Sequence, residues 1–438
     1  MQQAPLQQTN VAEAMLQLVG RLYPICRSIT GDGVRQTLRI IREYIPLTAH
    51  EVPSGTPVFD WTVPKEWNIR DAFVKNSRGE KIIDFRNCNL HVLNYSVPIH
   101  KQVSLEELKA HAFSLPERPE WIPYRTSYYK ENWGFCLSHN QLAALTDDEY
   151  EVYIDSSLED GQLTYGEYFI EGRTDDEILI STHVCHPSLA NDNLSGIAVA
   201  IQLAKQISLA APKYSYRFLF TPGTIGSITW LALNEPRAAR IKHGLILACL
   251  GDTGPITYKK SRRDNADIDR AVVQVLKESG ESYKVLDFSP YGYDERQFCS
   301  PGFNLPVGCF MRTPHGEFPE YHTSADNLAL VHADCLNDSL AKCSKILGTL
   351  EGNGIFVNLN PKCEPQLGKR GLYGFVGGAT DGRDRELAML WVLNLSDGSG
   401  SLLDIAEKSG IRFDIIRDAA DALFKHGVLK ELRSKVEA

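Results

Sequence analysis

Segment 180–196 carries two histidines and a carboxylate close together. His183 follows an apolar run, His186 comes shortly after it, and Asp192 precedes an apolar-periodic stretch that predicts a helix. Imidazole nitrogens and carboxylate oxygens are ligands of Zn²⁺, with Mn²⁺ and Fe²⁺ as weaker alternatives. Each residue alone also has an ordinary interpretation, as a core histidine, a loop histidine or, for Asp192, a helix N-cap.

Two further residues of these types follow other apolar runs. Asp252 comes directly after the run 244–250, and His322 lies beyond the run 305–311. In an open α/β sheet, ligands bind beyond the carboxyl ends of the strands, so these groups are expected to converge with His183 and Asp192. A mixed set of imidazoles and carboxylates favours one zinc ion. His186 is either an additional ligand or an ordinary loop histidine.

Two glutamates are the candidate proton acceptors or donors. Glu295 follows the apolar run 283–288 and is the first candidate, and Glu320 lies two residues before His322. Bound zinc lowers the pKa of its water towards about 7, so a base need only orient that water or shuttle a proton. The alternative is that Glu295 belongs to a structural ion-pair cluster.

The residues around Glu295 are the candidate substrate contacts. Arg296 has a planar fork that suits a substrate carboxylate or phosphate, and Tyr293 and Asp294 precede it. A basic run, 259–263, follows Asp252 and could steer an anionic substrate, although such runs are usually solvated surface.

The elements that must position these residues alternate between apolar runs and helical stretches. This alternation predicts a doubly wound, mostly parallel α/β sheet. The predicted strands are 178–181, 216–221, 244–250, 283–288 and 305–311, and the predicted helices are 194–207, 228–233, 268–278 and 335–350.

The remaining segments predict two further modules. Between 51 and 169, short β-branched and aromatic runs such as 81–85, 91–97 and 151–154 predict an inserted β-rich domain. After a linker at 353–378, helical stretches in 379–438 predict a winged helix. The α/β domain then comprises 1–50, which holds two predicted helices, and 170–352.

Composition narrows the function class. The 438 residues carry 46 Lys and Arg against 55 Asp and Glu, a net charge of −9, which argues against a protein that coats nucleic acid. The predicted recognition helix 413–426 is itself acidic, so we expect the winged helix, or the β-rich domain, to make protein or homo-oligomer contacts rather than DNA contacts.

No apolar run approaches the ~20 residues that span a bilayer. Ten scattered cysteines without a CxxC pair predict a reduced, cytoplasmic protein.

The motifs around the candidate ligands resemble the zinc aminopeptidase superfamily. The resemblance rests on His183, the Asp192-Asn-Leu-Ser-Gly element, Asp252 and the His322-Thr-Ser-Ala-Asp element. With the motif that begins at Arg27, the chain is similar to bacterial aminopeptidase-like proteins with an inserted β-domain and a winged helix, often associated with surface-polysaccharide biosynthesis. The resemblance implies four metal ligands, with Asp192 as the carboxylate that bridges two metal positions. They are His183, Asp192, Asp252 and His322.

The chain departs from that family at three positions. Cys185 stands where the family has an aspartate that orients the first histidine. Gly223 and Thr224 stand where the family has two glutamates, a general base and a ligand of the second metal. A second metal is therefore not expected. Cys185 is interpreted as a space-filling residue, with a thiolate ligand or nucleophile as the alternative.

Three functions remain in competition. The first is a zinc-dependent hydrolase of an amide or peptide bond, acting on a peptide-like molecule, a modified sugar or a small biosynthetic intermediate. The second, motivated by Gly223, is a metal-binding, non-hydrolytic protein of a biosynthetic or assembly pathway. The third, a transcription regulator, is disfavoured by the acidic recognition helix.

Overall fold

The structure, a computed structural model, describes residues 4–372 and 380–432, with side chains from 11 to 372 and from 384 to 432. The chain forms two compact units, which are described separately. The first consists of Met1–Ala266 and Ser282–Ala341, and the second of Asp267–Glu281 and Lys342–Ala438. The described helices include none that is long and apolar enough to cross a membrane.

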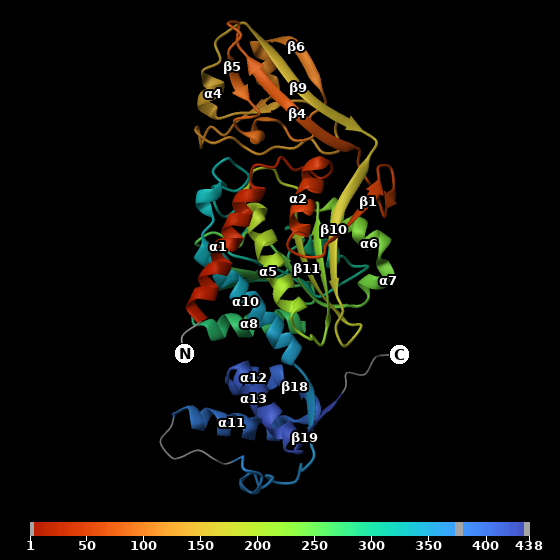
Figure 1. The fold of residues 1–438 in the computed structure, drawn as a ribbon, viewed down its shortest axis with the longest axis vertical. Helices are drawn as coiled ribbons and strands as arrows, with labels where there is room; N and C mark the ends of the chain where they lie inside the picture. The colour runs from red at the N-terminus through yellow and green to blue at the C-terminus, as the bar shows by residue number, and fades with distance from the viewer. Residues whose placement is uncertain (1–3, 373–379, 433–438) are drawn as a thin grey trace. The chain divides into compact units, whose positions relative to one another are not determined.

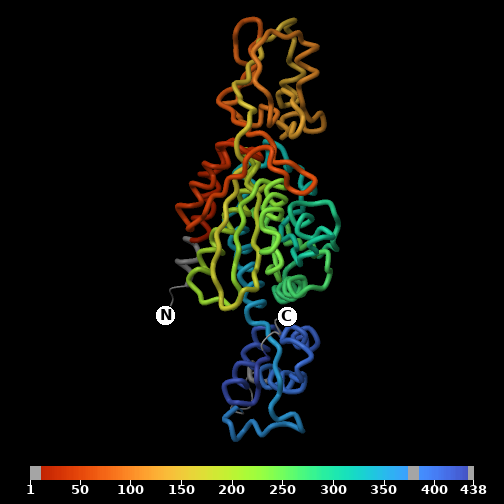
Figure 2. The backbone as a smooth tube through the Cα atoms, turned by 90° about the vertical axis from the view of Figure 1, so that its right-hand side faces the viewer, coloured from red at the N-terminus to blue at the C-terminus, as the bar shows by residue number. Residues whose placement is uncertain are grey.

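An eight-stranded sheet forms the centre of the first unit, in the order β1-β10-β12-β11-β13-β16-β14-β15. The yellow and green strands run side by side in Figure 2. β11 pairs in parallel with both β12 and β13, whereas β1, β10 and β14 make antiparallel pairs. The strands are β1 (Thr48–Pro53), β10 (Gln162–Ile170), β11 (Glu177–His183), β12 (Ser215–Thr221), β13 (Ile241–Leu247), β14 (Ile256–Lys259), β15 (Tyr283–Leu286) and β16 (Val307–Met311).

The order of the strands places a topological switch at β11. The chain leaves β11 through α5 (Gly196–Ser208) to β12 on one side, then returns through α6 (Ile225–Leu233) to β13 on the other. Right-handed crossovers in opposite directions put their helices on opposite faces of the sheet, and a ligand crevice opens where they diverge. The doubly wound, mostly parallel fold expected from the sequence is confirmed.

Buried apolar residues explain why these segments are strands. Every residue of β11, β12 and β16 is buried, as continuous apolar runs between two helical layers require. The other helices of this unit are α1 (Ala4–Leu22), α2 (Asp32–Arg42), α7 (Glu235–Ala238) and α9 (Glu295–Phe298), and α10 (Ala333–Gly352) continues beyond it. Figure 1 shows α1, α5 and α10 together, and α1 contacts α5.

A four-stranded antiparallel sheet, in the order β5-β4-β9-β6, makes the middle of the β-rich region. The predicted strand 91–97 is wrong: this segment is a buried irregular loop after a 3₁₀ turn (Asn89–His91), because its polar groups bond to neighbouring loops rather than to a strand ladder. The elements are β2 (Pro57–Val58), β3 (Trp61–Thr62), β4 (Glu66–Lys75), β5 (Lys81–Asp84), β6 (Ile99–Ser104), α3 (Leu105–Ala110), β7 (Ala112–Phe113), β8 (Phe135–Cys136), α4 (His139–Ala143) and β9 (Glu149–Glu159).

The second unit contains the winged helix, as expected from the sequence. A three-stranded sheet, β18-β17-β19, packs with three helices, and Arg417 on α13 forms an ion pair with Asp421. The expected linker 353–378 contains β17, and its Gly377–Gly378 pair lies outside the described residues. The elements are α8 (Asp267–Ser279), β17 (Ile355–Asn358), α11 (Thr380–Leu395), β18 (Asp397–Ser401), α12 (Leu402–Ser409), α13 (Phe413–Lys425) and β19 (Leu429–Leu432).

Candidate metal centre and adjoining cavity

His183 and Asp192 meet at the carboxyl end of β11, where the sheet switches direction. His183 is the last residue of the strand, and its Nε2 lies 2.8 Å from Asp192 Oδ1. Asp192 lies in an irregular turn, Ala190–Ser195, that precedes α5 and is entirely buried. The side chain of Asp192 is fully shielded from solvent.

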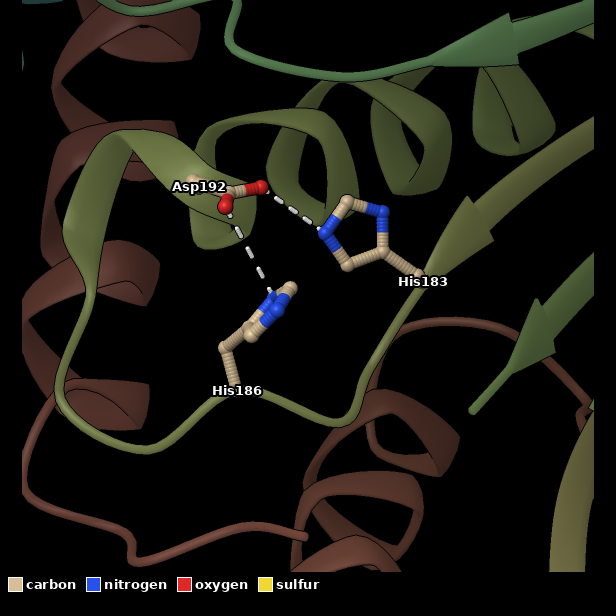
Figure 3. Close-up of side chains that lie close together, drawn as sticks. All are labelled: His183, His186 and Asp192. Atoms are coloured by element: carbon tan, nitrogen blue, oxygen red, sulfur yellow. Dashed lines mark hydrogen bonds and ion pairs between the residues drawn. The ribbon is translucent and has the colours of Figure 1, made fainter. Parts of the chain in front are cut away.

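Two more imidazoles surround the second oxygen of the same carboxylate. His322 Nε2 lies 3.0 Å from Asp192 Oδ2, and His186 Nδ1 lies 3.8 Å from it (Figure 3 shows His186 and His183). We call His183, His186, Asp192 and His322 the histidine–carboxylate cluster. The donor atoms of its first three members lie within 4.8 Å of one another.

The donor set of this cluster fits a zinc ion. Zinc prefers imidazole nitrogen and carboxylate oxygen in a closely spaced group. His186 Nδ1 is buried and finds no hydrogen-bond partner in the described part of the chain, which is the state expected of a ligand atom without its ion.

The protonation states also suit metal binding. Burial lowers the pKa of His186 well below its usual value, so its imidazole is neutral and offers a lone pair. Burial opposes ionisation of Asp192, but the neighbouring His186 and His183 and hydrogen bonds from His183 and His322 hold its pKa well below the usual range. The cluster therefore combines a neutral imidazole at His186 with an ionised carboxylate at Asp192.

Asp326 fixes the turn that carries Asp192. Its Oδ1 accepts from the backbone N–H groups of Ala190 at 3.1 Å and Asn191 at 2.6 Å, and its Oδ2 accepts from that of Asp192 at 2.9 Å. Asn193 fixes the other end, donating to Leu247 O at 2.9 Å. Neither role was predicted from the sequence, although Asp326 lies within the motif that contains His322.

Arg27 holds the loop that carries His186. Its buried guanidinium donates from Nε to His186 O at 2.7 Å and from Nη2 to Pro187 O at 3.2 Å. The β-rich region contributes Tyr124, whose backbone N–H donates to His322 O at 2.8 Å. The tyrosine ring meets the rings of His186 and His322 edge-on. Segments far apart in the sequence thus position both histidines.

The carboxylate of Asp252 is held by groups that do not belong to the cluster. Its Oδ2 accepts from Asn191 Nδ2 at 2.9 Å, and its Oδ1 accepts from Thr313 Oγ1 at 2.6 Å. The residue that approaches the cluster after β13 is Cys249, whose Sγ lies 3.5 Å from the hydroxyl of Tyr293. That hydroxyl in turn donates to Asp192 Oδ1 at 3.1 Å.

A cavity of about 190 Å³ adjoins the cluster. A Cβ atom at Gly223 would lie 3.3 Å from His183 Cβ and 3.4 Å from Asp294 Oδ1, so Asp294 lies beside the position expected for the family's general base. Burial raises the pKa of Cys185 to about 12, which keeps it a thiol rather than a thiolate. The lining residues are His183, Cys185, His186, Gly223, Thr224, Tyr291, Gly292, Tyr293, Asp294, Arg296, His315 and Tyr321.

Asp294 and Glu295 have different environments although they are adjacent. Asp294 Oδ1 accepts from Ser227 Oγ at 3.0 Å, while its Oδ2 is buried with no partner among the described groups. Burial raises the pKa of Asp294 to about 6, against the opposing influence of His183. Glu295 is buried and paired with Lys259 Nζ at 2.6 Å. Glu320 does not line the cavity.

Arg296 lines the cavity, whereas the basic run 259–263 is engaged elsewhere. Lys259 also donates to Tyr291 O at 2.7 Å, and Lys260 pairs with Asp264. Arg262 donates to Asn304 Oδ1, and Arg263 donates to Asn304 O. These residues contact neighbouring loops rather than the cavity.

Comparison with known proteins gives two family matches. A family described as a domain of unknown function, DUF4910, matches residues 16–353, and a winged helix-turn-helix family matches residues 354–431. A Clostridium acetobutylicum protein, provisionally named a polysaccharide biosynthesis protein with aminopeptidase-like domain, is 58% identical over 413 residues, covering 94% of this chain and 95% of that protein.

Solved structures agree with these matches. A crystal structure from Clostridium acetobutylicum, provisionally described as a peptidase, is 55% identical with a TM-score of 0.92, covering 97% of this chain and 98% of its own. A zinc aminopeptidase from Bacillus subtilis shares the fold at 12% identity and a TM-score of 0.57, covering 80% and 96%. This chain therefore belongs to the DUF4910 family, combining an aminopeptidase-like fold with a C-terminal winged helix-turn-helix domain.

Proposed function

We propose that this protein is a single-zinc hydrolase of an amide or peptide bond, with the ion held by the histidine–carboxylate cluster. The observation that carries the proposal is the convergence of three imidazoles on the buried, ionised Asp192. A partnerless nitrogen on His186 and an adjoining cavity support it. Zinc bound there would lower the pKa of a water molecule and polarise a carbonyl group.

Asp294 is the proton acceptor in this proposal. Its carboxylate lines the cavity, keeps one oxygen without a protein partner, and has a pKa of about 6, close to the working pH of a general base. Glu295 is committed to Lys259, and Glu320 lies outside the cavity lining, so neither has comparable access. Tyr293 positions Asp192 through its hydroxyl.

The site accepts a small molecule or the end group of a larger one. The cavity of about 190 Å³ is smaller than the roughly 300–1,000 Å³ of pockets that enclose drug-sized ligands. The name of the Clostridium acetobutylicum relative links that protein to polysaccharide biosynthesis. We extend this link to the present chain, as a cytoplasmic enzyme acting on an amide-bearing intermediate.

Metal analysis paired with turnover tests the proposal. Purified protein is expected to bind about one zinc ion per chain. It should also hydrolyse members of a panel of amino-acid amides and short peptides. His322→Ala should lose both properties, whereas His332→Ala, at an exposed histidine, should keep them. Unchanged zinc content in His322→Ala would contradict the assigned site. Zinc binding without turnover would instead favour the non-hydrolytic alternative.

A further inference from the structure

The cavity wall formed by the 291–296 loop and its neighbours has polar atoms that lack protein partners. Arg296 Nε and His315 Nδ1 are both buried, and neither has a hydrogen-bond partner within residues 11–372 and 384–432. Both residues line the cavity. Leaving a buried donor or acceptor unsatisfied costs about 1–3 kcal/mol, so these atoms mark a place where a ligand or water completes the wall.

Arg296 acts electrostatically on the nearby Asp294 carboxyl but forms no direct ion pair among the described residues. The adjacent Glu295 is held by Lys259 at 2.6 Å, and Asp294 accepts from Ser227. A guanidinium stays charged at any physiological pH and presents a planar fork that matches a carboxylate with two parallel hydrogen bonds. An anionic ligand group would therefore supply what this wall lacks.

The other groups in the wall favour a carboxylate over a phosphate. His315 is neutral, because burial lowers its pKa, so it adds a single dipole rather than a second positive charge. The Asp294 carboxylate lines the same cavity, and it would repel a phosphate, which carries about −1.5 to −2 charges at pH 7. The single positive charge of Arg296 balances the single negative charge of a ligand carboxylate.

The size and remaining walls of the cavity limit the rest of the ligand. A volume of about 190 Å³ limits the part of the ligand that lies inside the cavity to a small group. Tyr291, Tyr293 and Tyr321 line the cavity with aromatic rings, and an apolar stem packs well against such rings. A short acyl chain that ends in a carboxylate fits this space, whereas a longer molecule enters it only with its end group.

We propose that Arg296, with His315, binds a carboxylate of the substrate, so that the substrate class is a short acidic acyl compound. The amide bond would lie towards His183 and the carboxylate at Arg296, both of which line the one cavity. The identification of the carboxylate as part of a hydrolysed substrate rests on the proposed function. The binding of a carboxylate at Arg296 requires neither zinc nor hydrolysis.

Calorimetric titration of the full chain with glutarate tests this inference. Zinc-free protein is used first, so that the probe cannot simply coordinate a metal ion, and the zinc-loaded protein is titrated second. Glutarate is expected to bind, and its diamide, glutaramide, is expected to bind at least about tenfold more weakly, since a charge-assisted pair contributes about 1.5–3 kcal/mol. Inorganic phosphate serves as the competing anion.

Substitutions assign the binding to Arg296. Arg296→Gln should lower glutarate affinity at least about tenfold, and Arg296→Lys, which keeps the charge but not the fork, should fall between that variant and the wild type. Arg262→Gln, in the basic run outside the cavity, is the matched control and should bind as the wild type does. Circular dichroism checks that each variant is folded, and Arg296→Lys replaces Arg296→Gln if the latter is not.

Three results would overturn the inference. They are equal affinity of the wild type and Arg296→Gln for glutarate, tighter binding of phosphate than of glutarate, and no glutarate binding below a Kd of about 10 mM. Glutarate binding that depends on Arg296, in a protein that neither holds zinc nor hydrolyses amides, would instead remove the proposed function and leave the anion site in place.

Discussion

The buried polar groups on the two sides of the cavity differ in the protein partners that they contact. The turn that carries Asp192 is tied down by three backbone N–H bonds to Asp326, and Asp192 itself contacts three imidazoles. The 291–296 loop leaves Asp294 Oδ2 and Arg296 Nε without protein partners. On the first side the partnerless His186 Nδ1 belongs to a candidate ligand, which suits a resident ion, whereas the partnerless atoms of the second side suit a molecule that comes and goes.

Glu295 offers the strongest test of this difference, because it lies on the open side yet forms a buried ion pair with Lys259. Glu295→Gln should lower the free energy of unfolding by about 3–5 kcal/mol, since it leaves the buried Lys259 charge uncompensated. Zinc content should not change. Urea unfolding and metal analysis measure the two effects. In the double variant Lys259→Met/Glu295→Gln, stability should be partly recovered.

A large effect on zinc binding or turnover, with little effect on stability, would contradict this assignment of Glu295. It would return the residue to the catalytic role expected from the sequence.

Ionisation of Asp294 should lower the free energy of unfolding as the pH rises. Its carboxyl keeps its proton in the folded chain up to a pKa of about 6, whereas an unfolded aspartate loses it near the ordinary pKa of 3.8. The resulting stabilisation is fully present below the unfolded pKa and is lost as the pH rises through about 6. Relative to Asp294→Asn, zinc-free wild type should therefore lose about 3 kcal/mol across that window.

Urea unfolding of both proteins at a series of pH values gives this difference directly. Asp334→Asn, at an exposed carboxylate, is the control and should show no such window. A wild type that gains stability relative to Asp294→Asn as the pH rises would show that the carboxylate is paired after all, and the two sides of the cavity would then be alike.

Substitution of Asp326 tests whether the turn that carries Asp192 must be held rigidly for zinc to bind. Asp326→Ala removes the acceptor of the N–H groups of Ala190, Asn191 and Asp192, so the ligand-bearing turn loses its support. Loss of such supporting contacts typically weakens metal affinity about 10–100-fold. Competition with a chelator measures the zinc affinity, and Asp334→Ala is the matched control. An affinity within about twofold of the wild type would mean that the turn is held by Asn193 alone.

The fold and the centre of the site follow from local sequence patterns. The apolar run before His183 and the apolar period after Asp192 predict a strand end and a helix start, and both residues lie there. The strand end before Asp252 is predicted less accurately, because β13 ends at Leu247 rather than at residue 250. The chain turns at Cys249, which has a φ of 50°, and the role of Asp252 as a ligand stays a prediction. An apolar run in the sequence does not show at which residue the hydrogen bonds between neighbouring strands end.

Other parts of the site depend on contacts that no local pattern contains. Tyr124 reaches His322 from the β-rich region, and Arg27 reaches His186 from the N-terminal region. β14 is a four-residue strand, and its sequence, Ile-Thr-Tyr-Lys, has too little periodicity to be recognised. The different environments of Asp294 and Glu295 depend on Lys259, which is brought to the loop only by the folded sheet.

Gly223 lies where the two sides of the cavity meet and should give the smallest effect. Gly223→Ala places a methyl group 3.4 Å from Asp294 Oδ1, an ordinary contact, and 3.3 Å from His183 Cβ, which must move by a few tenths of an ångström. We expect a loss of about 1 kcal/mol in unfolding free energy, at the low end for overpacking. Thermal unfolding measures this loss, and chelator competition should show that zinc affinity is kept, since so small a movement leaves the cluster together. A selective loss of zinc affinity would instead show that the movement of His183 disturbs the cluster, and would mean that the first side is less firmly held than its contacts indicate.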